Sequence, residues 1–150
     1  MPGVKVAADR FDSRMQTLPK DDFPTLPDGT GQSTATLPGA ALKEMVAKTQ
    51  FAITGEDTRY FLNGAQFVLR GDEMTLVATD GHRLAFGQII LEQAVAGNTE
   101  RLEVIVPRKT ILECQHLLDD SDEPLNIQLT SNQVKFTFGS IELLSKLVEG

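Results

Sequence analysis

The stretch that most constrains the fold is 77–85, which reads Val-Ala-Thr-Asp-Gly-His-Arg-Leu-Ala. An apolar run enters a compact polar turn and leaves as a second apolar run, a pattern that predicts two strands joined by a tight corner. Gly81 can supply the positive φ that such a corner needs. The corner also sets a carboxylate, an imidazole and a guanidinium close together at Asp80, His82 and Arg83. We therefore expect two antiparallel strands with polar and charged side chains gathered at the turn between them.

The rest of the chain predicts two helices and several more strands. Apolar residues recur at helical spacing over 38–49 and 107–118, and each segment opens at a proline, with Thr36 as a candidate N-cap for the first. Strands are predicted at 58–62, 65–70, 74–79, 82–90, 101–106, 124–129, 133–138 and 140–147, with a loop at 92–99. Asn63-Gly64 is a strong hairpin signal. In each half of the chain a predicted helix is followed by a predicted meander of strands, which indicates a weak internal duplication. The predicted fold class is α+β with antiparallel sheet.

The first 27 residues follow a different pattern. A short strand is predicted at 4–7, without a local partner, and 11–15 could form another short strand. Residues 18–27 contain three prolines, a density that predicts an extended linker.

Composition narrows the class of protein. The chain has 150 residues, 41% of them hydrophobic, which suits an ordinary globular domain with a core. It has no apolar run near the roughly 20 residues that span a membrane and no apolar leader at its N-terminus. The single cysteine, Cys114, lies in a helical apolar pattern, which predicts a buried thiol and fits a reducing cytoplasm. The net charge of −7 argues against DNA binding by bulk charge, although it does not describe any one face.

Three long motifs occur in one order: Arg-Tyr-Phe-Leu-Asn-Gly at 59–64, Ala-Thr-Asp-Gly-His-Arg-Leu-Ala at 78–85, and Val-Ile-Val-Pro-Arg-Lys at 104–109. Together they resemble the middle domain of the bacterial DNA polymerase III beta subunit, the sliding clamp. The resemblance implies a DNA-clamp domain at 36–150, with two helices packed on antiparallel sheets. It also implies that 1–27 is the C-terminal tail of the preceding clamp domain and its linker.

The resemblance implies a non-catalytic processivity factor of DNA replication. The full protein would be a ring homodimer in the bacterial cytoplasm, associated with the nucleoid, that encircles duplex DNA without sequence preference. It would tether DNA polymerase III and clamp-loader subunits through short linear peptides, without cofactor or metal. The 150-residue chain alone is expected to be monomeric or weakly associated.

Two sets of residues follow from the resemblance. The partner-peptide pocket is expected at Leu62, Thr79, Gly81, His82, Arg83 and Leu84. The two leucines would form its apolar floor, while His82 and Arg83 would hold polar peptide atoms at the rim. The DNA-facing set is expected at Lys43, Lys48, Tyr60, Phe61, Arg108 and Lys109.

Plainer interpretations remain open for both sets. The four cations could form an ordinary solvated helix face. Tyr60 and Phe61 would alternate on a strand, one inward and one outward. Asp80 and Arg83 could form a structural ion pair, with His82 merely on the surface. A different class of function is a small metal-dependent hydrolase using Asp80 and His82, although no phosphate-binding glycine loop, dinucleotide fingerprint or nucleophile motif accompanies them.

Overall fold

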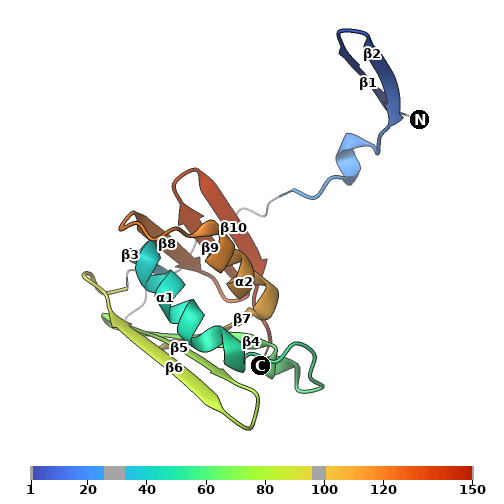
Figure 1. Ribbon diagram of the computed structural model, residues 1–150. Helices are drawn as coiled ribbons and strands as arrows, with labels where there is room; N and C mark the ends of the chain where they lie inside the picture. The colour runs from blue at the N-terminus through green and yellow to red at the C-terminus, as the bar shows by residue number, and fades with distance from the viewer. Residues whose placement is uncertain (1, 26–32, 96–100, 150) are drawn as a thin grey trace.

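The computed structural model describes residues 2–25, 33–95 and 101–149, and its main body repeats one unit twice (Figure 1). Each unit is a strand, a helix and a three-stranded meander. The first comprises β3 (Ser33–Pro38), α1 (Gly39–Thr49), β4 (Gly64–Arg70), β5 (Glu73–Thr79) and β6 (Leu84–Ile90). The second comprises β7 (Leu102–Pro107), α2 (Arg108–Leu117), β8 (Pro124–Leu129), β9 (Gln133–Phe138) and β10 (Ile141–Lys146). The predicted duplication is therefore present, with a strand before each helix.

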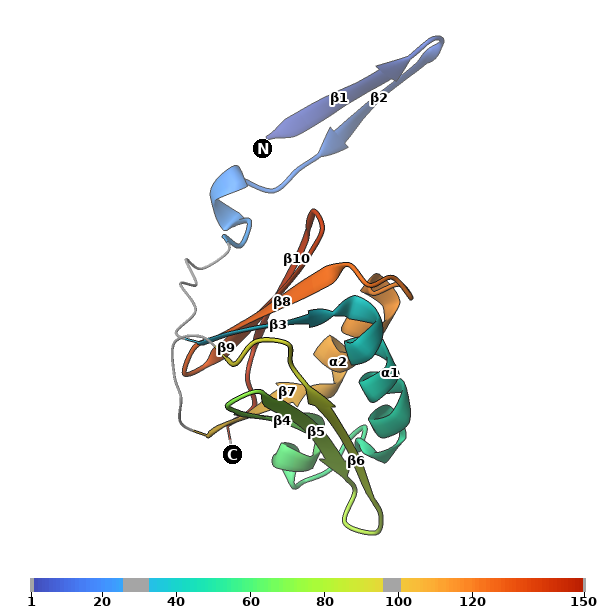
Figure 2. The same cartoon turned by 90° about the vertical axis from the view of Figure 1, so that its left-hand side faces the viewer.

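The two units are interlocked through their first strands. The strands β3 to β10 pair antiparallel in two four-stranded sheets, ordered β6-β5-β4-β7 and β10-β9-β8-β3. Thus β7 joins the meander of the first unit, and β3 joins that of the second. Both helices lie together on one side of the body, as the view turned by 90° shows (Figure 2). The predicted fold class, α+β with two helices on antiparallel sheets, is confirmed.

A single core lies between the sheets and helices. Phe67 of β4 and Phe136 of β9 meet edge to face with ring centroids 6.2 Å apart, so the two sheets contact each other directly. Leu42 and Val46 of α1 and Ile111 of α2 are fully buried against them. These helices therefore present one face to the core and the opposite face to solvent.

Cys114 of α2 is buried in this core, as its helical pattern predicts. Burial, together with the neighbouring Glu113 carboxylate, raises the pKa of its thiol to about 12. The thiol is consequently protonated at neutral pH and unreactive.

The predicted strand at 58–62 is wrong. Tyr60–Leu62 forms a 3₁₀ turn, η3, and Gly64 begins β4, so Asn63-Gly64 does not join two strands of a hairpin. The Asn63 side chain organises the loop instead, because its Oδ1 accepts hydrogen bonds from the Thr54 hydroxyl and the Asp57 N–H, and its Nδ2 donates to the Asp57 carbonyl at 3.2 Å. Such local side-chain bonds compete with a sheet ladder for the backbone.

Thr36 does not cap the first helix, because it lies in β3, a strand that the sequence analysis did not predict. Its hydroxyl donates to Asn126 Oδ1 of β8 at 2.7 Å. The N-cap position of α1 belongs to Pro38. The first helical N–H groups, of Gly39 and Ala40, donate to the Glu123 and Ser121 carbonyls at 2.9 and 3.2 Å. The acidic loop before β8 therefore caps α1 through its backbone.

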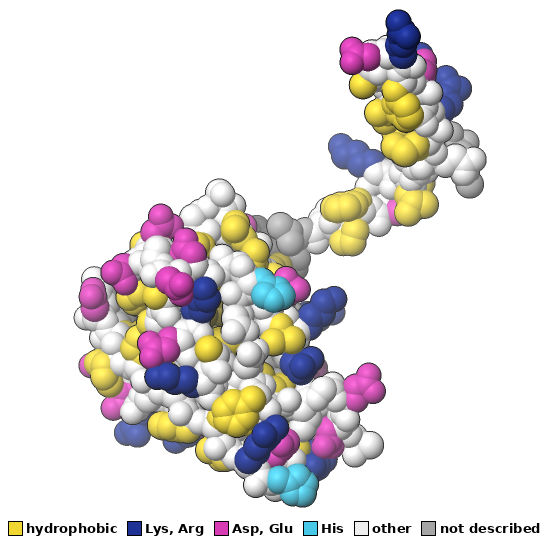
Figure 3. Space-filling view, in the orientation of Figure 1, with side chains coloured by type: hydrophobic (Ala, Val, Ile, Leu, Met, Phe, Trp, Pro, Cys, Tyr) yellow, Lys and Arg dark blue, Asp and Glu magenta, His cyan; other side chains and the backbone are white. Residues whose placement is uncertain are grey.

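The predicted strand near the N-terminus has a partner after all. β1 (Gly3–Ala8) and β2 (Phe11–Gln16) form an antiparallel hairpin, followed by a short 3₁₀ turn at Lys20–Asp22 within the predicted linker. Val4, Val6, Phe11 and Met15 share one face of this hairpin and are exposed, as the run of hydrophobic side chains in Figure 3 shows. The described residues do not include 26 and 27 of the predicted linker. They also do not include 96–99 of the predicted loop. Within the described ranges, no helix is long and apolar enough to cross a membrane.

Candidate functional site

The turn between β5 and β6 is held by its own side chains. The Asp80 carboxylate accepts the N–H groups of His82 and Arg83 on Oδ1, both at 2.9 Å, and the Arg83 Nε on Oδ2 at 3.0 Å. The Thr79 hydroxyl donates to the Arg83 carbonyl at 2.7 Å and accepts the Gly81 N–H at 3.1 Å. Gly81 takes φ +89°, which favours glycine. The structural ion pair between Asp80 and Arg83, left open as the plainer interpretation, is therefore present.

These bonds also fix the charge of Asp80. The backbone N–H groups of Arg83 and His82, and then the Arg83 guanidinium, lower the pKa of the Asp80 carboxyl to about 2. The carboxylate stays ionised near neutral pH, and all of these donors favour its charged form.

Arg59 brings a second loop against this turn. Its guanidinium binds Asp57 through two bonds, Nε to Oδ1 at 3.1 Å and Nη2 to Oδ2 at 3.0 Å. The same guanidinium lies over Gly81, where an added Cβ would stand 3.0 Å from Nη1. Asp57 and Arg59 are supporting residues that the sequence analysis did not single out. Their two-residue spacing is compatible with an ion pair, but no local signal places that pair over a glycine of another turn.

The structure brings five of the six predicted pocket residues together on this turn, namely Thr79, Gly81, His82, Arg83 and Leu84. Leu84 pairs with Thr79 and is 65% exposed, so it offers free apolar surface. Leu62 lies in the neighbouring loop that Arg59 joins to the turn, and it is only 9% exposed. Leu62 therefore offers little open apolar surface to a ligand.

The predicted DNA-facing cations are unequal. Lys43 pairs with Asp120 at 3.2 Å and Lys48 with Glu44 at 2.7 Å, whereas Arg108 and Lys109, at the start of α2, are exposed and make no ion pair within the part of the chain that the structure describes. Lys48 lowers the pKa of the Glu44 carboxyl through its hydrogen bond and its charge. In the view onto the helices, basic and acidic side chains are interspersed (Figure 3). The solvent-exposed surface of α1 and α2, called the helix face below, is therefore mixed in charge.

Tyr60 and Phe61 do not alternate between inside and outside. Both lie on η3 and are exposed, 57% and 45%, with their rings edge to face at 5.9 Å. The prediction that one of them points inward is wrong because the backbone turns here instead of extending.

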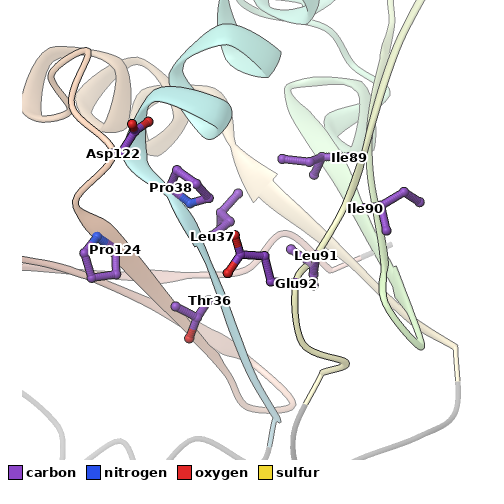
Figure 4. Close-up of a pocket in the computed structure, with 9 residues that line it drawn as sticks. All are labelled: Thr36, Leu37, Pro38, Ile89, Ile90, Leu91, Glu92, Asp122 and Pro124. Carbon is purple, nitrogen blue, oxygen red and sulfur yellow. The ribbon is translucent and has the colours of Figure 1, made fainter.

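One hollow of about 500 Å³ lies elsewhere, between β3, the end of β6 and the segment before β8 (Figure 4). Its lining combines apolar side chains such as Leu37 and Ile89 with the carboxylates of Glu92 and Asp122. None of the six predicted pocket residues lines it.

The hydrolase alternative gains no support from this geometry. Both oxygens of Asp80 are already bonded within its own turn. Among the residues that the structure describes, no three His, Cys, Asp or Glu side chains lie close enough together to hold a metal ion. Asp80 and His82 therefore form a structural corner rather than a metal site.

Comparison with known proteins agrees with the fold. The family described as "DNA polymerase III beta subunit, central domain" matches residues 36–150. The beta sliding clamp of Escherichia coli K12 is 40% identical over 147 residues, covering 98% of this chain and 38% of that protein. The crystal structure of the DNA polymerase III subunit beta from Pseudomonas aeruginosa has a TM-score of 0.90 and 36% identity, covering 99% of this chain and 40% of that one. A Pseudomonas aeruginosa sliding clamp bound to griselimycin has a TM-score of 0.86 and 36% identity, covering 99% and 39% of the two chains.

The fold and the matched region define a domain of the DNA-clamp class. The chain belongs to the DNA polymerase III beta subunit family, and its residues 36–150 match that family's central domain. It spans about two fifths of the length of the curated relatives that it matches.

Proposed function

We propose that this chain is the central part of a ring-shaped sliding clamp, a replication processivity factor that encircles duplex DNA and tethers DNA polymerase III. The observation that carries the proposal is the family match over 36–150 together with a fold match along 99% of the chain. In this proposal the clamp does no chemistry itself. It keeps the polymerase on DNA by encirclement, because a closed ring cannot dissociate from the duplex even when it binds the DNA weakly.

The mixed charge of the helix face supports this mechanism. A sliding contact needs weak contacts to phosphates and none to base edges. Arg108 and Lys109 are free of ion pairs to described residues, so they can meet phosphates directly. Lys43 and Lys48 must exchange Asp120 and Glu44 for a phosphate, which weakens their contribution. Exposed Tyr60 and Phe61 can contact sugars or bases by stacking.

The β5–β6 turn is proposed as one side of a pocket for short partner peptides. Leu84 offers exposed apolar surface beside the polar rim of the turn, which suits a Leu or Phe anchor flanked by polar peptide atoms. The Pseudomonas aeruginosa clamp, solved bound to griselimycin, is a relative known to take a ligand. In this proposal the partners are polymerase and clamp-loader subunits, and the remaining pocket walls come from residues outside 1–150.

We further infer that residues 1–27 belong to the preceding clamp domain. The apolar face of the β1–β2 hairpin is exposed, and an isolated two-stranded hairpin is marginal in water, so this face needs further sheet to cover it. The proposed full protein is a homodimeric ring in the bacterial cytoplasm near the chromosome, whereas the 150-residue chain is expected to stay monomeric or to associate weakly.

The DNA-facing proposal predicts weak, salt-dependent binding of duplex DNA. The chain is titrated by NMR with a mixed-sequence duplex at low salt. Amide shifts are expected at the start of α2, equally for unrelated sequences, and salt should abolish them. Replacing both Arg108 and Lys109 with Ala should lower the slope of log affinity against log salt by roughly 1–2, because each phosphate contact contributes about 0.9.

The control replaces Arg70 and Arg101 with Ala. These cations line a hollow on the outward face of the β4–β7 sheet, so their removal changes net charge equally without touching the helix face. Equal losses in the two double variants would show that bulk charge, not the start of α2, determines binding.

A further inference from the structure

Arg83 bridges the β5–β6 turn to a segment far away in sequence. Its Nε donates to Asp80 Oδ2 at 3.0 Å, while its Nη2 donates to the carbonyl oxygen of Phe51 at 2.9 Å. The guanidinium carbon also lies 5.2 Å from the centroid of the Phe51 ring. Phe51 belongs to the 3₁₀ turn η2 (Gln50–Ala52), which directly follows α1. One side chain thus joins the candidate pocket to the end of a proposed DNA-facing helix.

The contact uses properties that only arginine has. A planar guanidinium can donate in two directions at once and stack on an aromatic face, whereas an ammonium acts as a single point charge. Two of its five N–H groups already have protein acceptors, and these two bonds fix the plane of the guanidinium between the turn and η2. The side chain is 59% exposed, and such exposed ion pairs contribute little to global stability. The consequence of the bridge is therefore local.

That local consequence is the placement of the turn. Arg83 holds the Asp80 carboxylate, and the carboxylate in turn holds the N–H groups of His82 and Arg83. The Arg59 guanidinium also lies over Gly81 of the same turn. The backbone that carries His82 and Leu84 is thereby fixed relative to α1 before any ligand arrives.

We propose that Arg83 is a positioning residue of the partner pocket, which anchors the β5–β6 turn to η2 instead of binding the polar atoms of a partner peptide. This inference rests on the proposed function of the turn. It assigns peptide contact to His82 and Leu84, and it assigns to Arg83, Asp80 and Phe51 the task of holding them in place. A pocket fixed in advance loses less entropy on binding.

The test compares Arg83→Lys, Arg83→Ala and the control Arg101→Ala in the 150-residue chain. Arg101 is 58% exposed and pairs with Glu103, so it matches Arg83 in exposure and type of contact. The probe is a short synthetic peptide containing Gln, Leu and Phe, titrated by NMR. Both Arg83 variants should bind it roughly tenfold more weakly, since one or two charge-assisted hydrogen bonds are lost, while melting temperatures stay within about 3 °C. Arg101→Ala should bind like the parent chain.

Lysine is the deciding substitution, because it keeps the charge and loses the bridge. If Arg83→Lys binds like the parent while Arg83→Ala does not, Arg83 contacts the peptide directly and the inference is overturned. Parent-like binding by Arg83→Ala also overturns it. Because Arg83 acts partly through Asp80, the losses of affinity in Asp80→Asn and Arg83→Ala should be less than additive in the double variant.

A measurement without peptide separates this inference from the proposed function. Amide hydrogen exchange at Gly81, His82 and Arg83 should be faster in both Arg83 variants than in the parent and in Arg101→Ala. If the parent does not bind the peptide but exchange increases, the pocket proposal fails and the bridge stands. Unchanged exchange overturns the bridge whatever the peptide does.

Discussion

Replacing Phe67 with Ala is expected to lower the free energy of unfolding by about 3–5 kcal/mol. Phe67 is 1% exposed at the centre of the β6-β5-β4-β7 sheet, between Leu76 of β5 and Val104 of β7. Its ring also meets Phe136 across the core, so truncation loses burial and one edge-to-face pair and leaves a cavity between the sheets. Urea unfolding followed by circular dichroism measures the change.

The matched control is Phe86→Ala. Phe86 lies on β6 of the same sheet and is 61% exposed, so little buried area is lost there. The expected cost is below about 1 kcal/mol. A cost below 1 kcal/mol for Phe67→Ala as well would contradict the packing of the two sheets through this ring.

Replacing Gly64 with Ala is expected to cost about 1–3 kcal/mol through steric overlap. Gly64 opens β4 opposite Pro107 of β7, and an added Cβ would overlap the Val106 carbonyl oxygen and stand 3.0 Å from Ile105 Cγ2. Because backbone cannot rotate away as a side chain can, β7 must shift from β4. The shift should appear in urea unfolding and in the amide spectra of both strands.

Gly55→Ala provides the control for backbone entropy. Gly55 has nothing within 4 Å of an added Cβ and no positive φ, so alanine fits there without strain. The expected change is neutral or slightly stabilising, by less than about 1 kcal/mol. If both glycine variants unfolded at the same urea concentration, the close approach of β4 and β7 at Gly64 would be wrong.

The sequence predicts most of this fold because its helices and central strands carry regular apolar periods. The sequence does not predict β3, because Ser-Thr-Ala-Thr-Leu-Pro contains only two clearly apolar residues and its pairing with β8 spans most of the domain. The prediction of a strand at 58–62 is wrong because its aromatic residues favour strands. The Asn63 side chain overrides that preference through bonds to Thr54 and Asp57.

The contacts of the candidate site are likewise only partly predictable from the sequence. The Asp80–Arg83 pair is three residues apart in sequence and was foreseeable from the motif itself. The bond from Arg83 to the Phe51 carbonyl joins residues 32 apart, and the Arg59 guanidinium reaches Gly81 from another loop. Those contacts depend on how the turns meet in space, which no local pattern encodes.

The measurement that tests the central proposal most directly is amide chemical-shift mapping of the 150-residue chain with the Gln-, Leu- and Phe-containing peptide in excess. We expect shifts at Leu62, Thr79, Gly81, His82, Arg83 and Leu84, with weak affinity because anchors without their remaining walls stay partly hydrated. A control peptide with Ala in place of Leu and Phe should leave these amides unmoved. Shifts that gather elsewhere while these six stay silent would contradict the assignment of the partner pocket to the β5–β6 turn.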